Sequence, residues 1–194
     1  MTLDFDFSVL YAIRDAFASG KADDLMRAIT MLGDGGFIWI VLGVGLLLYR
    51  RTRWTGFAVL LALALTAVVG NLGLKPLVDR LRPCDIMGFT LLPVCPPDPS
   101  FPSGHTAAAF ASAGVLWLRR SPWFWAALIL AALIAFSRLY LFVHFPTDIL
   151  AGILLGLTGA WVAVKFIEWL HRGQLATHNG FSFEIRRLTS RLTG

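Results

Sequence analysis

The sequence predicts an all-α protein: a polytopic transmembrane helical bundle of about five spans, with a pair of interfacial helices at the N-terminus. Three observations lead to this prediction. The chain has 194 residues, of which 57% are hydrophobic and 15% charged, and this is more apolar than a soluble domain of that length needs. The apolar residues come in blocks, and the basic residues gather in the connections between alternate blocks.

Five blocks without acidic or basic side chains, apart from His105, define the expected spans. They are residues 37–49, 54–74, 103–118, 121–137 and 149–164. About 20 mostly apolar residues cross a hydrocarbon core of about 30 Å, so the shorter blocks need flanking residues or a locally thinner bilayer. Five buried helices in a soluble protein are the alternative, but so short a chain has too little polar surface to cover them.

The charge distribution indicates how the spans are oriented. The net charge is +5, and most cations lie in three places: Arg50, Arg51 and Arg53; Arg119 and Arg120; and Lys165, Arg172, Arg186, Arg187 and Arg191. By parity these places share one side, and an excess of cations marks the cytoplasmic side. The acidic residues before position 37 place the N-terminus outside, and the C-terminus is expected inside. The basic balance therefore reflects topology, and no nucleic-acid partner is expected. A cleavable signal peptide is not expected either, because the first residues are acidic.

A single domain is expected over residues 1–194, with N-terminal interfacial helices at 1–35, a bundle at 36–170 and a cytoplasmic tail at 171–194. Apolar residues at helical spacing share one face of each expected helix: Phe7, Leu10, Tyr11 and Phe17; Leu25, Ile29 and Leu32; and, in the tail, Ile185, Leu188 and Leu192. The tail is expected to rest on the inner membrane surface or to be loosely ordered. Asp23 and Asp24 suit the start of the second helix, and glycines after Leu32 end it. This helix pair is expected to lie at the outer interface or to pack on the bundle.

The long connection over residues 75–102 contains both cysteines, Cys84 and Cys95. The predicted topology places them in an oxidising space, where disulfides persist. Closing such a loop stabilises a fold by about 3 kcal/mol in the chain-entropy model. A Cys84–Cys95 disulfide is therefore predicted, and two free thiols are the alternative.

Residues with potential chemistry gather in the two outer connections and at the helix ends beside them. They are Lys75, Arg82, Ser103, Gly104, His105, Arg138, His144 and Asp148. Lys75 and Arg82 are seven residues apart and share a face if that stretch is helical. Ser103 and Gly104 stand at a helix N-terminus, where free N–H groups and the helix dipole favour an anion. Pro146 suits the start of the last span.

These residue types suit phosphoryl transfer. Lys75, Arg82 and Arg138 would bind phosphoryl oxygens and stabilise charge in the transition state, with the Ser103 hydroxyl and the Gly104 N–H as further donors. The imidazole of His144 would be the nucleophile, and the Asp148 carboxylate would accept from its other ring nitrogen. His105 would protonate the leaving oxygen, and water would then hydrolyse the phosphohistidine.

Each residue also has a simpler interpretation. Arg138 can snorkel to the interface, Ser103 can serve only as a helix cap, and Asp148 can serve only to complement a helix dipole. His144 can be an interfacial histidine. A metal site of two histidines and one carboxylate is the other specific hypothesis, but three nearby cations would repel a metal ion and attract a phosphate.

Three motifs in this order resemble the type 2 phosphatidic acid phosphatase superfamily. A lysine followed after six residues by Arg-Pro begins at Lys75, Pro-Ser-Gly-His ends at His105, and Ser-Arg, five residues, His, three residues and Asp runs from Ser137 to Asp148. The resemblance implies a lipid phosphatase without metal or cofactor, with His144 as nucleophile, His105 as acid and the remaining roles as above. Soluble vanadate haloperoxidases share the pocket residues but are larger and not embedded in a membrane.

Within the superfamily, the five-span layout resembles bacterial undecaprenyl pyrophosphate phosphatases of the bacitracin-resistance type. It implies an enzyme of the bacterial inner membrane that recycles the cell-wall carrier, with the lipid bilayer and a lipid phosphate as its partners. Short phosphatidylglycerophosphate phosphatases are also similar, so phosphatidylglycerophosphate or phosphatidic acid is the alternative substrate. A lipid-binding or lipid-transporting protein without turnover is the hypothesis from another class.

Overall fold

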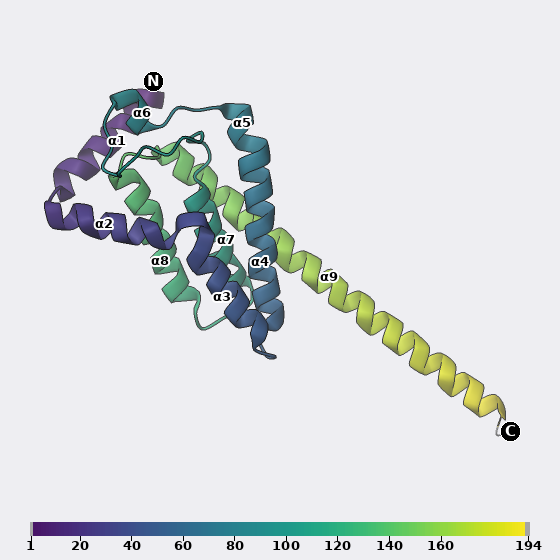
Figure 1. Cartoon of the computed structure of the whole chain (residues 1–194). Coiled ribbons are helices and arrows are strands. Elements are labelled where there is room, and N and C mark those ends of the chain that lie inside the picture. Colours follow the sequence, from purple (N-terminus) through teal and green to yellow (C-terminus); the bar gives the residue numbers. More distant parts are fainter. Residues whose placement is uncertain (1, 193–194) are drawn as a thin grey trace.

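The computed structural model describes the backbone of residues 2–192 and the side chains of residues 5–170. Within these residues the secondary structure is helical and contains no strand. In Figure 1 helices α1 to α8 and the first part of α9 gather into one bundle, and the rest of α9 projects away from it. The elements are α1 (Thr2–Phe17), α2 (Gly20–Leu32), η1 (Asp34–Gly36), α3 (Phe37–Leu48), α4 (Arg53–Ala67), η2 (Val68–Leu74), α5 (Lys75–Val78), α6 (Pro83–Met87), α7 (Gly104–Leu118), α8 (Phe124–Tyr140) and α9 (Pro146–Leu192). The predicted all-α class is confirmed.

The five expected spans coincide with α3, α4 plus η2, α7, α8 and the first part of α9. Two stretches are long and apolar enough by themselves to cross a membrane, Arg53–Met87 and Pro146–Leu170. α2 with α3 meets the same criterion only as a pair bent by 40°, and α8 is a shorter apolar helix. The number of helices that cross the bilayer therefore stays a prediction.

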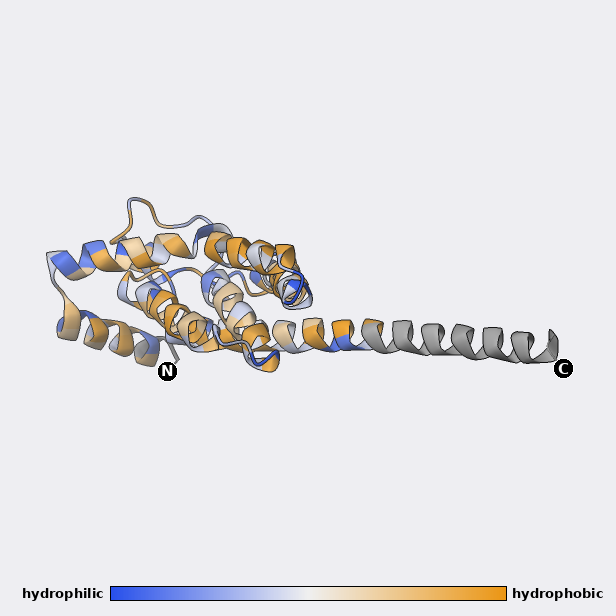
Figure 2. Ribbon diagram, turned by 90° about the horizontal axis from the view of Figure 1, so that it is seen from below, coloured by the Kyte–Doolittle hydropathy of each residue, from blue (hydrophilic) through white to orange (hydrophobic). Residues whose placement is uncertain are grey.

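Exposed apolar side chains on the outer surface indicate a lipid environment. Leu72, Leu77, Leu154 and Trp169 are each at least 66% exposed, whereas a soluble protein rarely exposes such large apolar surface. In Figure 2 the ribbons of the bundle helices are coloured largely as hydrophobic, with hydrophilic residues mainly in short segments. The bundle thus has the surface of an integral membrane protein.

Helix α7 lies at the centre and is built from small residues. It packs against α4, α8 and α9, and most of its alanines are buried. Gly152 and Gly156 of α9 permit this approach: a Cβ atom at Gly156 would lie 2.5 Å from the carbonyl oxygen of Ala107, and one at Gly152 would lie 2.8 Å from that of Ser103. The backbone N–H of Ser103 also donates to the carbonyl of Asp148 (3.1 Å). This contact fixes the starts of α7 and α9 side by side.

The N-terminal helices pack on the bundle. α1 contacts α8 and α9, α2 contacts α8, and Leu10 is fully buried in a cluster with residues of the loop between α8 and α9. The apolar face predicted for α2 is only partly buried, because Leu25 and Leu32 are 55% and 44% exposed while Ile29 packs inward. In a membrane protein the lipid-facing side of a helix is also apolar, so spacing alone does not identify the buried face.

Lys75 and Arg82 do not share a continuous helix. The seven residues that precede Lys75 form the π-helix η2, and at its end the N–H of Lys75 donates to the carbonyl of Gly70. Helix α5 then ends at Asp79, whose φ of 44° is left-handed, and Arg82 has extended backbone before Pro83. Pro76 explains part of this irregularity, because a proline ring clashes with the carbonyl four residues earlier in a regular α-helix. The continuous helix on which a shared face of Lys75 and Arg82 depended is therefore absent.

The side chains of the predicted tail, including Ile185, Leu188 and Leu192, lie outside the described residues. Pro146 begins α9 as predicted, with Asp148 in its first turn.

Candidate active site

The predicted functional residues come together at one end of the bundle, where η2 and α8 end and α7 and α9 begin. A cavity of about 480 Å³ lies there, and we call it the polar cavity. Its wall includes Lys75, Arg82, Gly104, His105, Arg138 and His144. Asp148 and Ser103 are fully buried behind this wall.

Lys75 and Arg82 meet at a carboxylate that the sequence analysis did not select. Asp98, in the long loop, pairs with Lys75 and accepts from Arg82 Nη2 at 2.8 Å, and Arg82 Nε donates to the Asp98 carbonyl at 2.8 Å. Burial opposes ionisation of Asp98, but the hydrogen bond from Lys75 and the charge of Arg82 outweigh it and hold the pKa of the carboxyl below its usual value. A charged carboxylate therefore occupies cation contacts of the kind that a phosphate oxygen would make.

Arg138, the third predicted cation, is 3% exposed near the end of α8. Its Nη1 donates to the hydroxyl of Thr30 in α2 (2.6 Å), and its Nε is buried without a partner among the described residues. Burying a guanidinium donor without a partner is costly. Because Arg138 also lines the polar cavity, an anion in that cavity would supply the missing charge and acceptor.

His144 lies in the loop between α8 and α9 with its Nε2 atom 3.1 Å from Arg82 Nη1. A guanidinium donates and never accepts, so Nε2 is the unprotonated nitrogen and Nδ1 carries the proton. On the Nδ1 side lie the Ser100 hydroxyl at 3.4 Å and Asp148 Oδ2 at 3.7 Å. Ser100 in turn donates to Asp148 Oδ2 at 2.6 Å. The hydroxyl of Ser100 thus bridges the predicted His144–Asp148 pair.

The surroundings of His144 keep its imidazole neutral. Burial is the largest cause, and the charges of Arg138 and Arg82 add to it against the opposing hydrogen bond with Asp148; together they lower the pKa of His144 well below its usual value. A neutral imidazole has the free lone pair that a nucleophile needs, and here that lone pair lies beside the cationic side chains that would bind the phosphate.

His105, in the first turn of α7, is paired with a second carboxylate. Its Nε2 atom lies 2.8 Å from Asp34 Oδ1. Asp34 belongs to η1, where Gly35 and Gly36 adopt positive φ, a conformation that glycine enters without steric cost. The glycine turn expected after α2 therefore also places a carboxylate at the polar cavity.

Ser103 acts as the N-cap of α7. Its hydroxyl accepts from the N–H and the hydroxyl of Thr106, which is the capping role that the sequence left open. Gly104 lines the cavity, and a Cβ atom there would meet no other atom within 4 Å. A donor role of Ser103 and Gly104 toward phosphate stays a prediction.

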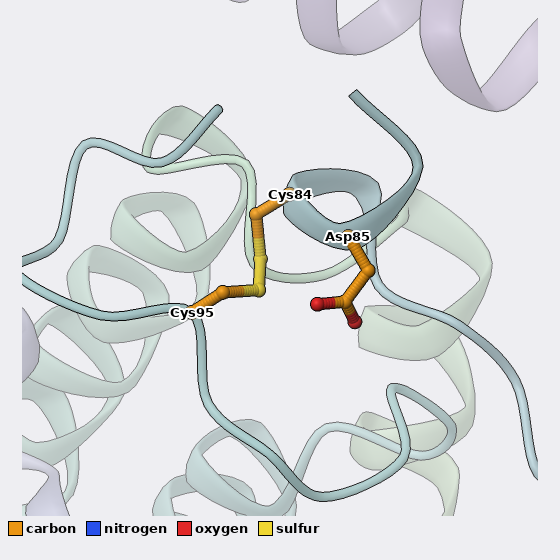
Figure 3. Close-up of side chains that lie close together, drawn as sticks. All are labelled: Cys84, Asp85 and Cys95. Atoms are coloured by element: carbon orange, nitrogen blue, oxygen red, sulfur yellow. A yellow bond between two sulfur atoms is a disulfide. The ribbon is translucent and has the colours of Figure 1, made fainter. Parts of the chain in front are cut away.

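The predicted Cys84–Cys95 disulfide is present. Figure 3 shows Cys84 on α6 joined to Cys95 of the following loop, with Asp85 beside them. Among the described residues, these three form the one group of at least three His, Cys, Asp or Glu residues whose ligand atoms all lie within 4.8 Å of one another, and both sulfur atoms are already bonded. The alternative metal set of His105, His144 and Asp148 is not brought together in this way.

A second cavity, of about 610 Å³, continues from the polar cavity, and we call it the apolar groove. Lys75, Asp98, Gly104 and His105 line both. The rest of the groove wall comes mainly from apolar or small residues of α3, α4, η2 and α7. A polar compartment and an apolar compartment thus share one wall that includes the predicted general acid His105, whereas His144 lines the polar cavity alone.

Comparisons with known proteins agree with this geometry. Residues 55–172 match the PAP2 superfamily. The chain belongs to the PAP2 superfamily. Over 134 residues, or 68% of the chain, it is 35% identical to a protein of Sulfolobus acidocaldarius named undecaprenyl-diphosphatase, of which it spans 63%.

Two solved structures share the fold of this PAP2 protein. Aquifex aeolicus LpxE matches with a TM-score of 0.71 and 28% identity over 83% of this chain and 95% of that one. A transmembrane PAP2-type phosphatidylglycerolphosphate phosphatase from Bacillus subtilis matches with a TM-score of 0.65 and 30% identity over 83% and 85% of the two chains. The predictions that the chain belongs to this phosphatase family and that it is an integral membrane protein are therefore confirmed.

Four further residues shape the site of this PAP2 protein but were not selected from the sequence: Asp34, Arg80, Asp98 and Ser100. Arg80 lies two residues before Arg82, inside the motif that begins at Lys75, so its charge could have marked it as a site residue. The other three reach the site only through tertiary packing of loops, and no periodic pattern marks them.

Proposed function

We propose that this PAP2 protein hydrolyses a lipid phosphate or pyrophosphate through a phosphohistidine at His144, without a metal ion. The observation that carries the proposal is the position of His144: a buried imidazole whose Nε2 atom lies 3.1 Å from Arg82 Nη1 at the polar cavity. The phosphoryl group would bind Lys75, Arg82 and Arg138 in place of the Asp98 carboxylate.

The reaction takes two steps. The Nε2 lone pair of His144 attacks phosphorus, the bond to the leaving oxygen breaks, and that oxygen takes a proton from His105. Asp34, 2.8 Å from His105, stabilises the imidazolium that holds this proton. In the second step His105 takes a proton from water, which attacks phosphorus and releases inorganic phosphate and free His144.

The apolar groove supports a lipid as the carrier of that phosphate. A headgroup in the polar cavity would leave its first apolar carbons in the groove, between α3, α4 and α7. The site also lies at the opposite helix ends from the arginine-rich connections that precede α4 and follow α7. Because cationic connections favour the cytoplasmic side, we place the site at the outer face of the membrane and the C-terminus inside.

Undecaprenyl pyrophosphate, hydrolysed to the monophosphate in the bacterial inner membrane, is our first choice of substrate. It is supported by the Sulfolobus relative's name and by the outward placement of the site. Phosphatidylglycerophosphate is the second candidate, supported by the name of the Bacillus structure.

The test is phosphate release by the purified protein in detergent with EDTA present. The panel contains undecaprenyl pyrophosphate, phosphatidylglycerophosphate, phosphatidic acid and a soluble phosphate ester. We expect turnover in EDTA, fastest with undecaprenyl pyrophosphate. Preference for another lipid would overturn the substrate, and folded protein that binds these lipids without turnover would indicate a carrier.

Asp98 gives a prediction about affinity. In the Asp98→Asn variant no carboxylate competes for Lys75 and Arg82, so inorganic phosphate should inhibit at about tenfold lower concentration, since a nearby like charge is worth one to a few kcal/mol. Phosphate inhibition curves measure this directly.

The matched control is Asp79→Asn, which removes the same charge from an exposed carboxylate of the same connection that forms no ion pair among the described side chains. An equal gain in both variants would mean that only the overall charge matters, and the competition would be rejected.

A further inference from the structure

The carboxylate behind the nucleophile is held from both of its oxygens. Asp148 Oδ2 accepts from Ser100 and from the backbone N–H of Phe145 at 2.8 Å. Its Oδ1 accepts from Arg80 Nη1 at 2.7 Å. The same guanidinium lies over the Phe145 ring, 4.0 Å from its centre. Arg80 therefore fixes both the charge and the direction of Asp148 from the side away from His144.

Arg80 is itself held by the N-terminal helix. Its Nη2 donates to Asp6 Oδ2 of α1 at 2.6 Å, and Asp6 is fully buried. The Thr147 hydroxyl accepts from Arg80 at 2.7 Å and donates to Asp6 at 3.0 Å. Burying a carboxylate costs free energy unless it is paired, so the fold depends on Arg80 and Thr147 being placed against Asp6. Asp6 lies outside residues 55–172, the part of the chain that matches the superfamily.

Helix α1 also packs on the backbone that carries His144. Phe142 adopts a φ of +57°, an uncommon conformation for a bulky residue that persists only when its surroundings enforce it. The rings of Tyr11 and Phe142 lie 6.0 Å apart, and Phe7 meets Phe145 edge-to-face at 5.3 Å. α1 thus braces the nucleophile loop by packing as well as by charge.

We propose that Asp6 and Arg80 are positioning residues for the nucleophile, so that α1 is part of the catalytic machinery. The inference rests on the proposed phosphatase function of His144. Asp6 divides the charge of Arg80 between two carboxylates, which leaves Asp148 negative enough to support the His144 imidazole as Nε2 attacks. Without Asp6, Arg80 pairs with Asp148 alone and weakens that support.

The test measures kcat and KM for the preferred lipid in Asp6→Asn, Arg80→Gln, Arg80→Lys and the double variant Asp6→Asn/Arg80→Gln. We expect kcat to fall about tenfold in Asp6→Asn and about 100-fold in Arg80→Gln, as small displacements of a catalytic group do, with KM nearly unchanged. Arg80→Lys should recover part of the loss. The double variant should be no slower than Arg80→Gln, because Asp6 acts only through Arg80. In Arg80→Gln alone, Asp6 stays buried without its ion-pair partner, and the double variant removes that unpaired charge.

The matched control is Arg14→Gln, which breaks another α1 ion pair, with Asp23, at a distance from the Asp148 network. It should leave kcat unchanged. Equal losses in Arg14→Gln and Asp6→Asn, or losses in KM alone, would reduce α1 to a general structural role and overturn the proposal.

Failure of this inference is distinguishable from failure of the proposed function. If the wild type turns over and His144→Ala does not, full activity in Asp6→Asn and Arg80→Gln would reject the positioning role alone. If Arg80→Gln does not fold, Asp6→Asn and Arg80→Lys decide by the same kcat criterion.

Discussion

Replacing His144 by alanine is expected to lower kcat by about 10⁴-fold or more, because removal of a covalent nucleophile leaves only binding and electrostatic stabilisation. Affinity for the lipid phosphate should change little, since Lys75, Arg82 and Arg138 remain. The measurement is phosphate release in detergent, paired with binding of the same lipid. Brief incubation of the wild type with substrate labelled in the transferred phosphate should also yield acid-labile label on the protein, absent from the variant.

A matched test keeps the imidazole and weakens its support. The Ser100→Ala variant loses the hydroxyl that bridges His144 and Asp148 but keeps the nucleophile. Phosphate label should therefore still appear on the protein, at a lower rate than in the wild type. If His144→Ala retained turnover near the wild-type value, the phosphohistidine mechanism would be wrong.

Arg138→Lys should lower kcat/KM by about 10² to 10³-fold, the loss typical of one preorganised donor to a developing oxyanion. Lysine keeps the positive charge but lacks the planar fork, and it cannot replace both the Nη1 donor to Thr30 and the Nε donor that has no described partner. The measurement is kcat/KM for the preferred lipid in EDTA.

Thr30→Val provides the control for this variant. It removes the hydroxyl that orients Arg138 but leaves the guanidinium at the cavity, so a loss of only a few-fold is expected. Equal effects of Thr30→Val and Arg138→Lys would assign the role of Arg138 to the contact between α2 and α8 rather than to the phosphate.

The sequence predicted the convergence of the main site residues for a simple topological reason. Lys75, His105, Arg138 and Asp148 lie at helix ends that parity places on one side, and the structure brings these ends together. Helical spacing did not describe the path between Lys75 and Arg82, because a π-helix and a left-handed residue at Asp79 replace the continuous helix.

The supporting residues were not predictable in the same way. Ser100 and Asp98 lie in a proline-rich loop whose course depends on a disulfide and on contacts across the bundle. Asp6 contacts Arg80 across 74 residues of sequence, and no local pattern encodes such a pairing. Its apolar neighbour Leu10 was recognised as part of an apolar helix face, whereas a buried aspartate on the same helix carries no signal until its partner is known.

The close contact of α7 and α9 has a consequence for how this chain tolerates genetic variation. Gly152 and Gly156 carry no ionisable group and line neither cavity, yet any side chain there would meet a backbone oxygen of α7 or of its N-cap Ser103 at 2.8 Å or less. Such a collision would separate the helix starts that carry Ser103 and Asp148. Missense changes at these two uncharged positions should therefore be as damaging as changes at the charged residues, and an interpretation of variants by chemistry alone would misclassify them.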